Sequence, residues 1–277
     1  MAKPHKKPAA PRKGANPRQA LGELWPGQSI PLLKALHILT PEGAMNADSR
    51  RKLKQVLHLT GLLRPSLQQL FAAKEGPVLA DLGAGKSYLG FILYDLFFRE
   101  RGQVWGVEAR PELIAKSRAL ATESGFTRMD FVEGAISSAR LPDEKADIVT
   151  ALHACDTATD EAILFALAHD AKFVALVPCC QAEISNALEA SKKPERQLWR
   201  HPIQRREFGA HLTNVLRGLF LEAHGYKVRV TELTGLEHSL KNEFILAERH
   251  QLSNAQAKAE FTRLAEQFGV VPKLLPA

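Results

Sequence analysis

Short apolar runs and longer amphipathic segments alternate through the middle of the chain. Each apolar run has the length of a strand, and helical segments, whose apolar residues recur every three to four positions, lie between most of the runs. This order predicts a mostly parallel sheet with helices on both of its faces. The predicted strands are 78–81, 103–108, 130–133, 147–152 and 173–177. The predicted helices between them are 87–100, 111–124 and 159–168.

Two more apolar runs, 227–232 and 243–248, lie near the end of the chain. Their short connection predicts an antiparallel hairpin. The expected fold is therefore α/β, with a Rossmann-like sheet of seven mostly parallel strands, helices on both faces and a C-terminal antiparallel hairpin. An amphipathic helix over 255–268 follows, with Ser253 or Asn254 as its N-terminal cap.

The segment before the first strand has a helical pattern of its own. Apolar residues recur at helical spacing over 49–71, and Pro65 predicts a break that divides the segment into two helices. The first of these helices has a positive face beside the domain that follows. Its cations are Arg50, Arg51, Lys52 and Lys54.

The N-terminus differs from the rest of the chain in composition. Residues 1–20 combine Lys, Arg, Pro and Ala without apolar periodicity, so we expect a disordered basic arm. The net charge of +7 favours a polyanionic partner such as nucleic acid, although such an arm can also serve only for solubility. The expected domains are the arm 1–20, a helical segment 21–73, the α/β domain 74–250, and a C-terminal helix and tail 251–277.

The bulk composition narrows the class of protein. With 45% hydrophobic and 24% charged residues, the sequence is that of a globular protein and excludes a fibrous or wholly disordered one. No apolar run approaches the ~20 residues of a membrane span, and the N-terminus lacks the apolar part of a signal peptide, so we expect a cytoplasmic protein without a membrane partner. The three cysteines, Cys155, Cys179 and Cys180, are too few for a disulfide framework and are expected as thiols.

A glycine-rich loop follows the first predicted strand. The strand ends in Asp81, and Gly83 and Gly85 let the backbone approach a nucleotide closely before the next helix. The loop also fits a relaxed phosphate-loop pattern, but Asp81 would repel a triphosphate there. Glu108 ends the second strand, where a carboxylate can accept both ribose hydroxyls of an adenosine. These carboxylates favour a cationic, sulfonium-bearing adenosine cofactor over a nucleoside triphosphate, a dinucleotide or a purely structural turn.

Four motifs extend the pattern of this loop. They are Arg50-Arg51-Lys52-Leu53-Lys54-Gln55-Val56, Gly83-Ala84-Gly85-Lys86-Ser87-Tyr88-Leu89-Gly90, Leu152-His153-Ala154-Cys155-Asp156-Thr157-Ala158-Thr159-Asp160, and Val177-Pro178-Cys179-Cys180-Gln181. With them, residues from about 46 to 248 resemble the methyltransferase-like proteins that share the domain of the eukaryotic tRNA acceptor-stem 2′-O-methyltransferases. The resemblance implies a class I methyltransferase with S-adenosylmethionine (SAM) as its cofactor. It leaves the substrate open, because members of this group differ in their acceptors.

The resemblance also implies which residues contact the cofactor. Glu108 is expected on the ribose, while adenine is expected beyond the third strand. There Ala135 stands where an Asp is often found, so Glu133 or the backbone at 135–136 is expected in its place. The full expected set is Asp81, Gly83, Ala84, Gly85, Ser87, Glu108, Ala109, Glu133, Ala135 and His153.

A group of polar and sulfur-containing residues follows the fourth and fifth strands. Because parallel strands end at the same edge of a sheet, His153, Asp156 and Cys179 are expected near the transferred methyl group. His153 or Asp156 can accept a proton from the acceptor, although methyl transfer depends mainly on alignment. Cys179 or Cys180 as a nucleophile is a weaker alternative, since no neighbour activates the thiol. Another alternative is that the cysteine is buried and has only a structural role.

The same group of side chains also suggests a zinc site. His153, Cys155, Cys179 and Cys180 partly match a deaminase signature. However, Cys155 replaces the Glu that shuttles the proton, and two adjacent cysteines fit one tetrahedral ion poorly. We therefore expect no metal.

A basic stretch over 192–206 follows the fifth strand. Its cations can hold phosphates while Trp199 stacks on a base or packs into an apolar seam, and an ordinary solvated helix face is the alternative. This stretch can overhang the pocket for the methyl acceptor, and Lys241 and Asn242, before the last strand, are expected at the same pocket. The expected function is methylation of RNA, either tRNA or rRNA, with a protein side chain (such as that of a ribosomal protein) or a non-catalytic RNA-binding module as alternatives. The stretch contains Lys192, Lys193, Arg196, Trp199, Arg200, His201, Arg205 and Arg206.

Overall fold

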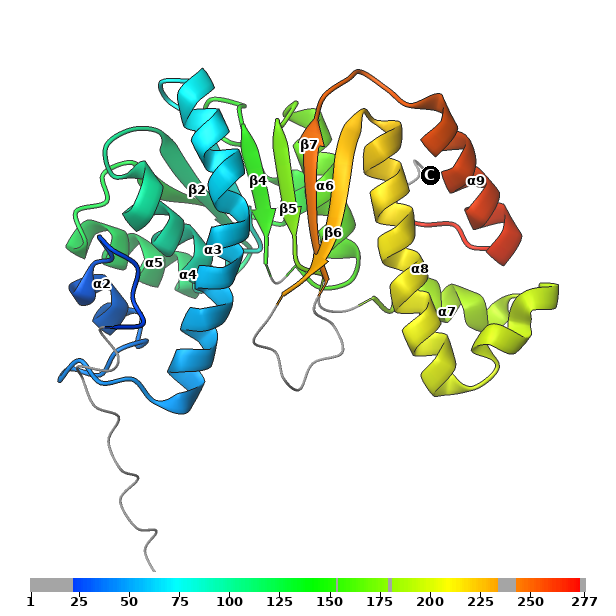
Figure 1. Cartoon of the computed structure of the whole chain (residues 1–277), viewed down its shortest axis with the longest axis horizontal. Helices are drawn as coiled ribbons and strands as arrows, with labels where there is room; N and C mark the ends of the chain where they lie inside the picture. The colour runs from blue at the N-terminus through cyan, green and yellow to red at the C-terminus, as the bar shows by residue number, and fades with distance from the viewer. Residues whose placement is uncertain (1–21, 153, 179–180, 234–242, 275–277) are drawn as a thin grey trace, which may run out of the picture.

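The computed structural model describes residues 22–152, 154–178, 181–233 and 243–274. Seven strands form one sheet in the order β3-β2-β1-β4-β5-β7-β6 (Figure 1). Strands β1 to β5 are parallel, whereas β7 is antiparallel to both β5 and β6. The predicted fold class is confirmed. The strands are β1 (Val78–Leu82), β2 (Gln103–Glu108), β3 (Met129–Glu133), β4 (Ile148–Ala151), β5 (Phe173–Leu176), β6 (Tyr226–Glu232) and β7 (Glu243–Arg249).

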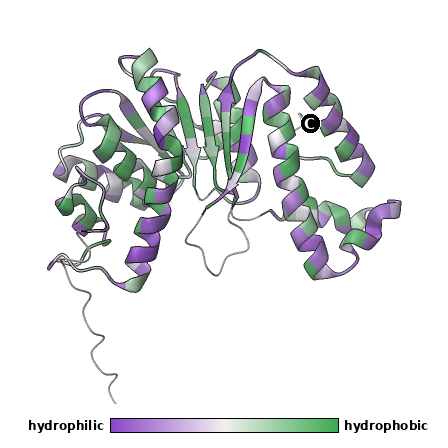
Figure 2. Cartoon of the chain, viewed as in Figure 1, coloured by the Kyte–Doolittle hydropathy of each residue, from purple (hydrophilic) through white to green (hydrophobic). Residues whose placement is uncertain are grey.

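Helices cover both faces of the sheet and close one apolar core on each side. Neighbouring residues of a strand point to opposite faces, so Leu79 joins the first core and Ala80 the second. The central strands are correspondingly hydrophobic along their length (Figure 2). The first core is covered by α2 (Ile30–Ala35), α3 (Ala47–Ala73), α4 (Tyr88–Leu93), its π-helical continuation Tyr94–Phe98, and α5 (Pro111–Glu123). The second is covered by α6 (Thr157–Ala168), α7 (Glu183–Ala190), the 3₁₀ turn η3 (Pro194–Trp199), α8 (Pro202–Ala223) and α9 (Ala255–Phe268).

Helix α3 corrects one prediction. It is a single helix that runs through Pro65, so the predicted division into two helices is wrong. A proline removes one hydrogen bond from a helix interior. Burial of the apolar stripe on both sides, including Leu63 and Leu67 at 0% exposure, continues across the proline and holds the helix together.

The C-terminal helix begins and ends as its sequence predicts. The Asn254 side chain accepts a hydrogen bond from Ala257 N (3.2 Å), and Gly269 ends the helix in the left-handed conformation. The apolar face of α9 packs on α8, with the rings of Phe220 and Phe261 5.7 Å apart. Over the described part of the chain, no helix combines the length and hydrophobicity that crossing a bilayer requires.

Some expected functional residues fall outside the described residues. These are the basic arm 1–20, His153, Cys179 with Cys180, and Lys241 with Asn242.

Candidate cofactor and active site

The loop after β1 makes a tight, left-handed path. Gly83 and Gly85 have φ values of 63° and 58°, which glycine adopts without steric cost. Ser87 is also left-handed, at 51°, and its N–H donates to the Ala84 carbonyl at 2.6 Å. The N–H of Ala84 donates to the Val107 carbonyl at 2.9 Å, so the loop is tied to the end of β2. This geometry places bare backbone at the carboxyl ends of β1 and β2.

Asp81 lies under this loop. Its side chain is 2% exposed, and it accepts hydrogen bonds from Thr150 Oγ1 (2.8 Å), Ser87 Oγ (3.3 Å) and the backbone of Gly90. Burial raises the pKa of Asp81 to about 6, and the hydrogen bonds limit that rise. At neutral pH Asp81 is therefore a negative charge close to its titration range.

Glu108 ends β2 beside the loop. Its Oε2 accepts a hydrogen bond from Gly85 N (2.7 Å), and its Oε1 accepts from Arg110 Nε (2.8 Å) and Arg110 N (3.1 Å). Burial opposes ionisation of Glu108, but these hydrogen bonds and the Arg110 charge outweigh it and hold its pKa below the ordinary value. The carboxylate is thus ionised and already occupied by donors.

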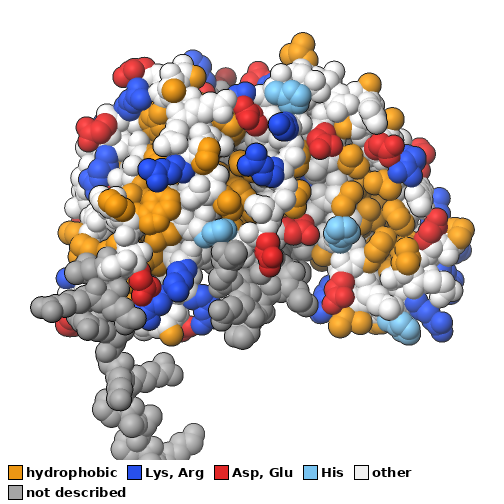
Figure 3. Space-filling model, in the orientation of Figure 1, with side chains coloured by type: hydrophobic (Ala, Val, Ile, Leu, Met, Phe, Trp, Pro, Cys, Tyr) orange, Lys and Arg blue, Asp and Glu red, His pale blue; other side chains and the backbone are white. Residues whose placement is uncertain are grey.

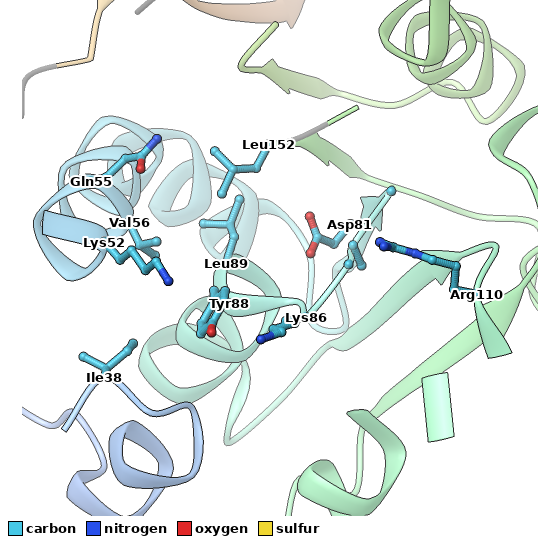
Figure 4. Close-up of a pocket in the computed structure, with 13 residues that line it drawn as sticks. Ile38, Lys52, Gln55, Val56, Asp81, Lys86, Tyr88, Leu89, Arg110 and Leu152 are labelled. Carbon is cyan, nitrogen blue, oxygen red and sulfur yellow. The ribbon is translucent and has the colours of Figure 1, made fainter. Parts of the chain in front are cut away.

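A cavity of about 430 Å³ opens in front of the loop (Figure 4). Four of the predicted cofactor residues line it: Asp81, Gly83, Ala84 and Gly85. Helix α3 forms the opposite wall and contributes Lys52, Gln55 and Val56. The remaining lining residues are Ile38, Lys86, Tyr88, Leu89, Arg110 and Leu152.

The other predicted cofactor residues that the structure describes do not line this cavity. Ser87 is buried beneath the loop, and Glu108 lies behind the Arg110 side chain. Glu133 is the neighbour of Glu108 across β2 and β3, and Ala109 and Ala135 are exposed at the same edge.

Sequence reasoning missed several residues of the site. Thr150 holds Asp81 from β4, Arg110 covers Glu108, and Lys86 follows the loop glycines into the cavity. Lys52 was expected on a positive face but not in the cofactor cavity. The only sequence signal for Arg110 was its place two residues after Glu108.

Comparison with known proteins agrees with this geometry. A family model described as a methyltransferase domain matches residues 51–187, which include most of α3, the glycine-rich loop and all five parallel strands. Residues 51–187 carry a methyltransferase domain. Its cofactor is S-adenosylmethionine.

The methyltransferase domain is also similar to curated proteins of greater length. A glutathione S-transferase C-terminal domain-containing protein from Bos taurus is 26% identical over 229 residues, which cover 74% of this chain and 34% of that protein. The Mus musculus protein of the same name is 26% identical over 228 residues. The chain thus spans about a third (34%) of the length of each of these relatives.

Two solved structures illustrate the likeness to known folds. Magnesium protoporphyrin IX methyltransferase from Synechocystis PCC 6803, with bound SAH, is 12% identical with a TM-score of 0.46, and the match covers 79% of this chain and 94% of that one. An rRNA methylase from Streptococcus thermophilus is 10% identical with a TM-score of 0.42, covering 64% and 89%. Neither likeness extends to a substrate.

The chemistry of the donors around the methyltransferase cavity fits the cofactor. SAM carries a ribose diol, an ammonium, a carboxylate and a sulfonium. Glu108 can accept from the ribose, the glycine backbone leaves room for the ligand, and the cavity wall holds both a carboxylate, Asp81, and cations. Binding of ribose at Glu108 requires the Arg110 side chain to withdraw, because both approach the same oxygens.

Asp156 connects the two segments on the acceptor side. It has an unusual backbone conformation (φ 51°, ψ −126°), and its Oδ1 accepts hydrogen bonds from Ala182 N (2.8 Å) and Glu183 N (3.1 Å). Its carbonyl accepts from Arg217, which is 1% exposed and paired with Asp160 at 2.8 Å. Asp156 therefore fixes the segment after β5 against the segment after β4.

The basic stretch beyond β5 is divided between packing and exposure. Trp199 is 3% exposed, donates from Nε1 to the Leu188 carbonyl (2.9 Å) and stacks on Phe208. Trp199 therefore packs into an apolar seam, as one of the two predictions states. The other prediction, that Trp199 stacks on a base, is wrong because the ring is buried. Arg205 pairs with Glu189. The exposed cations are Lys192, Arg196, Arg200 and Arg206.

Proposed function

We propose that this chain transfers methyl groups from SAM to RNA, either tRNA or rRNA. The observation that carries the proposal is the position of the cations relative to the cofactor loop. In Figure 1 the parallel strands end at the lower edge of the sheet, where α3 begins on one side and α7, followed by η3, lies on the other. Lys and Arg side chains lie along both sides of this edge (Figure 3). The exposed cations of α3, the cofactor loop and the segment beyond β5 include Lys52, Lys54, Lys86, Arg196, Arg200 and Arg206.

These cations are available to a partner. All six are exposed, and none of them forms an ion pair within the part of the chain that the structure describes. A polyanion that spans this edge would gain from each phosphate contact and from the release of counterions. The basic arm 1–20 would add to the same attraction.

The residues of the site have separate roles in the proposed reaction. SAM supplies a methyl group made electrophilic by the sulfonium. Glu108, with Ala109, Glu133 and Ala135 nearby, would hold the adenosine, and the loop backbone with Asp81 would hold the remainder. Leu89, Val56 and Leu152 make part of the wall apolar and exclude water from the reacting centre.

On the acceptor side we assign proton acceptance to His153. Asp156 would act as a positioning residue, because Oδ1 is occupied by two backbone N–H groups. A direct catalytic role for Cys179 stays a prediction, and so does a cytoplasmic location.

The test is methyl incorporation from labelled SAM into total extract of a strain that lacks the protein. The proposal predicts label that is lost on ribonuclease treatment and retained on protease treatment, and much less transfer by Glu108→Ala at limiting SAM. Label that resists ribonuclease but not protease would identify a protein acceptor and overturn the RNA assignment. Cofactor binding without transfer to any fraction would leave a non-catalytic binding module. Deletion of residues 1–20 should weaken RNA binding most at low salt.

A further inference from the structure

The charges that line the cofactor cavity are arranged asymmetrically. Among the described residues of the lining, Asp81, at the end of β1, is the single acidic side chain. Lys52, from α3, and Lys86, from the loop, lie on either side of the Tyr88 side chain, and their ammonium groups point toward it (Figure 4). Arg110 enters from the opposite side, next to Asp81 (Figure 4). The wall therefore has an acidic region and a separate basic region.

The basic region has no acidic partner among the residues that the structure describes. Two of the four cations at the start of α3 are neutralised locally, Arg50 by Glu23 and Arg51 by Asp48. Lys52, one residue further, lines the cavity and forms no ion pair among the described residues, and the same holds for Lys86. Arg110, the third cation of the lining, is paired with Glu108.

An amino-acid zwitterion matches this arrangement. The adenosine of SAM is expected at Glu108, so its amino-acid end extends across the loop toward α3. That end carries one ammonium and one carboxylate, and the carboxylate is the only negative charge on the molecule. Lys52 on α3 and Lys86 on the loop, neither in an ion pair among the described residues, provide the charge-assisted hydrogen bonds that a carboxylate requires.

We propose that Lys52 and Lys86 bind the α-carboxylate of SAM, with Asp81 facing its ammonium group. Helix α3 then completes the cofactor site and is not only a scaffold or an RNA-binding face. The pair selects for a cofactor with an intact amino acid over fragments that lack it. This inference rests on the cofactor assignment but not on RNA as the acceptor.

The test compares two ligands that differ only in this carboxylate, SAM and decarboxylated SAM, by calorimetry with wild type and variants. The wild type should prefer SAM. Lys52→Gln and Lys86→Gln should each weaken SAM binding by about fivefold to tenfold while leaving the affinity for decarboxylated SAM unchanged. The double variant should lose the preference. Lys54→Gln is the matched control, because Lys54 is exposed on the same helix but does not line the cavity.

Equal losses for both ligands, or no loss in either variant, would overturn the assignment while leaving the cofactor in place. If the wild type bound neither ligand, the cofactor assignment itself would fail, and this inference with it. Unchanged circular dichroism and melting temperature in the variants would exclude misfolding as the cause of any loss.

Discussion

Arg110 occupies the carboxylate of Glu108 that the ribose is expected to use. Its guanidinium approaches both oxygens, with Nε 2.8 Å from Oε1 and Nη2 3.3 Å from Oε2. The backbone N–H groups of Gly85 and Arg110 donate to the same carboxylate, which offers about four acceptor positions in all. Ribose hydroxyls must therefore compete with the Arg110 side chain.

Arg110→Ala should strengthen the binding of S-adenosylhomocysteine (SAH) by about threefold, because Glu108 no longer has to break an exposed ion pair first. Isothermal titration calorimetry measures the effect, with Lys116→Ala as a control for loss of a nearby positive charge. Weaker binding in Arg110→Ala would show that this side chain helps to hold the cofactor.

The raised pKa of Asp81 makes stability depend on pH. The pKa is 3.8 in an unfolded chain and about 6 in the folded protein, so between these values the folded state binds more protons. The contribution of Asp81 to the free energy of unfolding is therefore most favourable below about pH 4 and decreases as the pH rises to about 6. Asp81→Asn should remove this contribution. Between pH 4 and pH 7, the free energy of unfolding of the variant should rise by about 3 kcal/mol relative to that of the wild type.

Urea unfolding at several pH values measures this difference, and the exposed Asp143→Asn is the control. A difference between wild type and Asp81→Asn that does not change with pH would contradict the assignment of a raised pKa. A decrease in the relative stability of the variant with rising pH would mean that the sign is wrong.

Gly90 makes room for the hydrogen bonds of the cofactor loop. A Cβ atom at this position would lie 2.5 Å from Ser87 Oγ and 3.2 Å from Asp81 Oδ2. Gly90→Ala should displace Ser87 from Asp81 and weaken SAH binding by roughly tenfold or more. The control is Gly218→Ala in helix α8. A Cβ atom there would make only an ordinary contact at 3.9 Å, so SAH binding should be unchanged. Similar affinities of the two alanine variants would show that the loop adapts to the added methyl group.

The buried pair of Arg217 and Asp160 supports the acceptor side. Arg217 is 1% exposed and also donates to the Asp156 carbonyl. Arg217→Met leaves the Asp160 charge buried alone, so the free energy of unfolding should fall by about 3 kcal/mol. Arg217→Met with Asp160→Leu should recover much of that loss, because no unpaired charge remains. If the double variant is less stable than the single one in urea unfolding, the buried charge is not the cause of the loss.

Most of the fold follows from local patterns in the sequence. The strand β2 begins and ends where its apolar run does, and α9 begins and ends where its periodicity and cap do. Helix α3 is the exception, since the rule for a proline is local, whereas the packing of Leu63 and Leu67 that overrides it is tertiary.

The site was predictable only where its residues lie in one motif. The glycine loop, Asp81 and Glu108 could be found from the strand–turn–helix pattern. Thr150, 69 residues from Asp81, and Lys52 on α3 reach the site through the fold, and a single sequence contains no signal for such contacts. Arg110 was missed because no motif requires a cation after the ribose-binding acid.

The most direct test of the cofactor site is calorimetric titration of SAH into wild type and Glu108→Ala. The structure predicts saturable binding of one SAH per chain in the wild type and a loss of at least roughly tenfold in the variant, because a charged acceptor for two hydroxyls is removed. The absence of binding to the wild type, or equal affinities of the two proteins, would contradict a SAM site at the loop between β1 and α4.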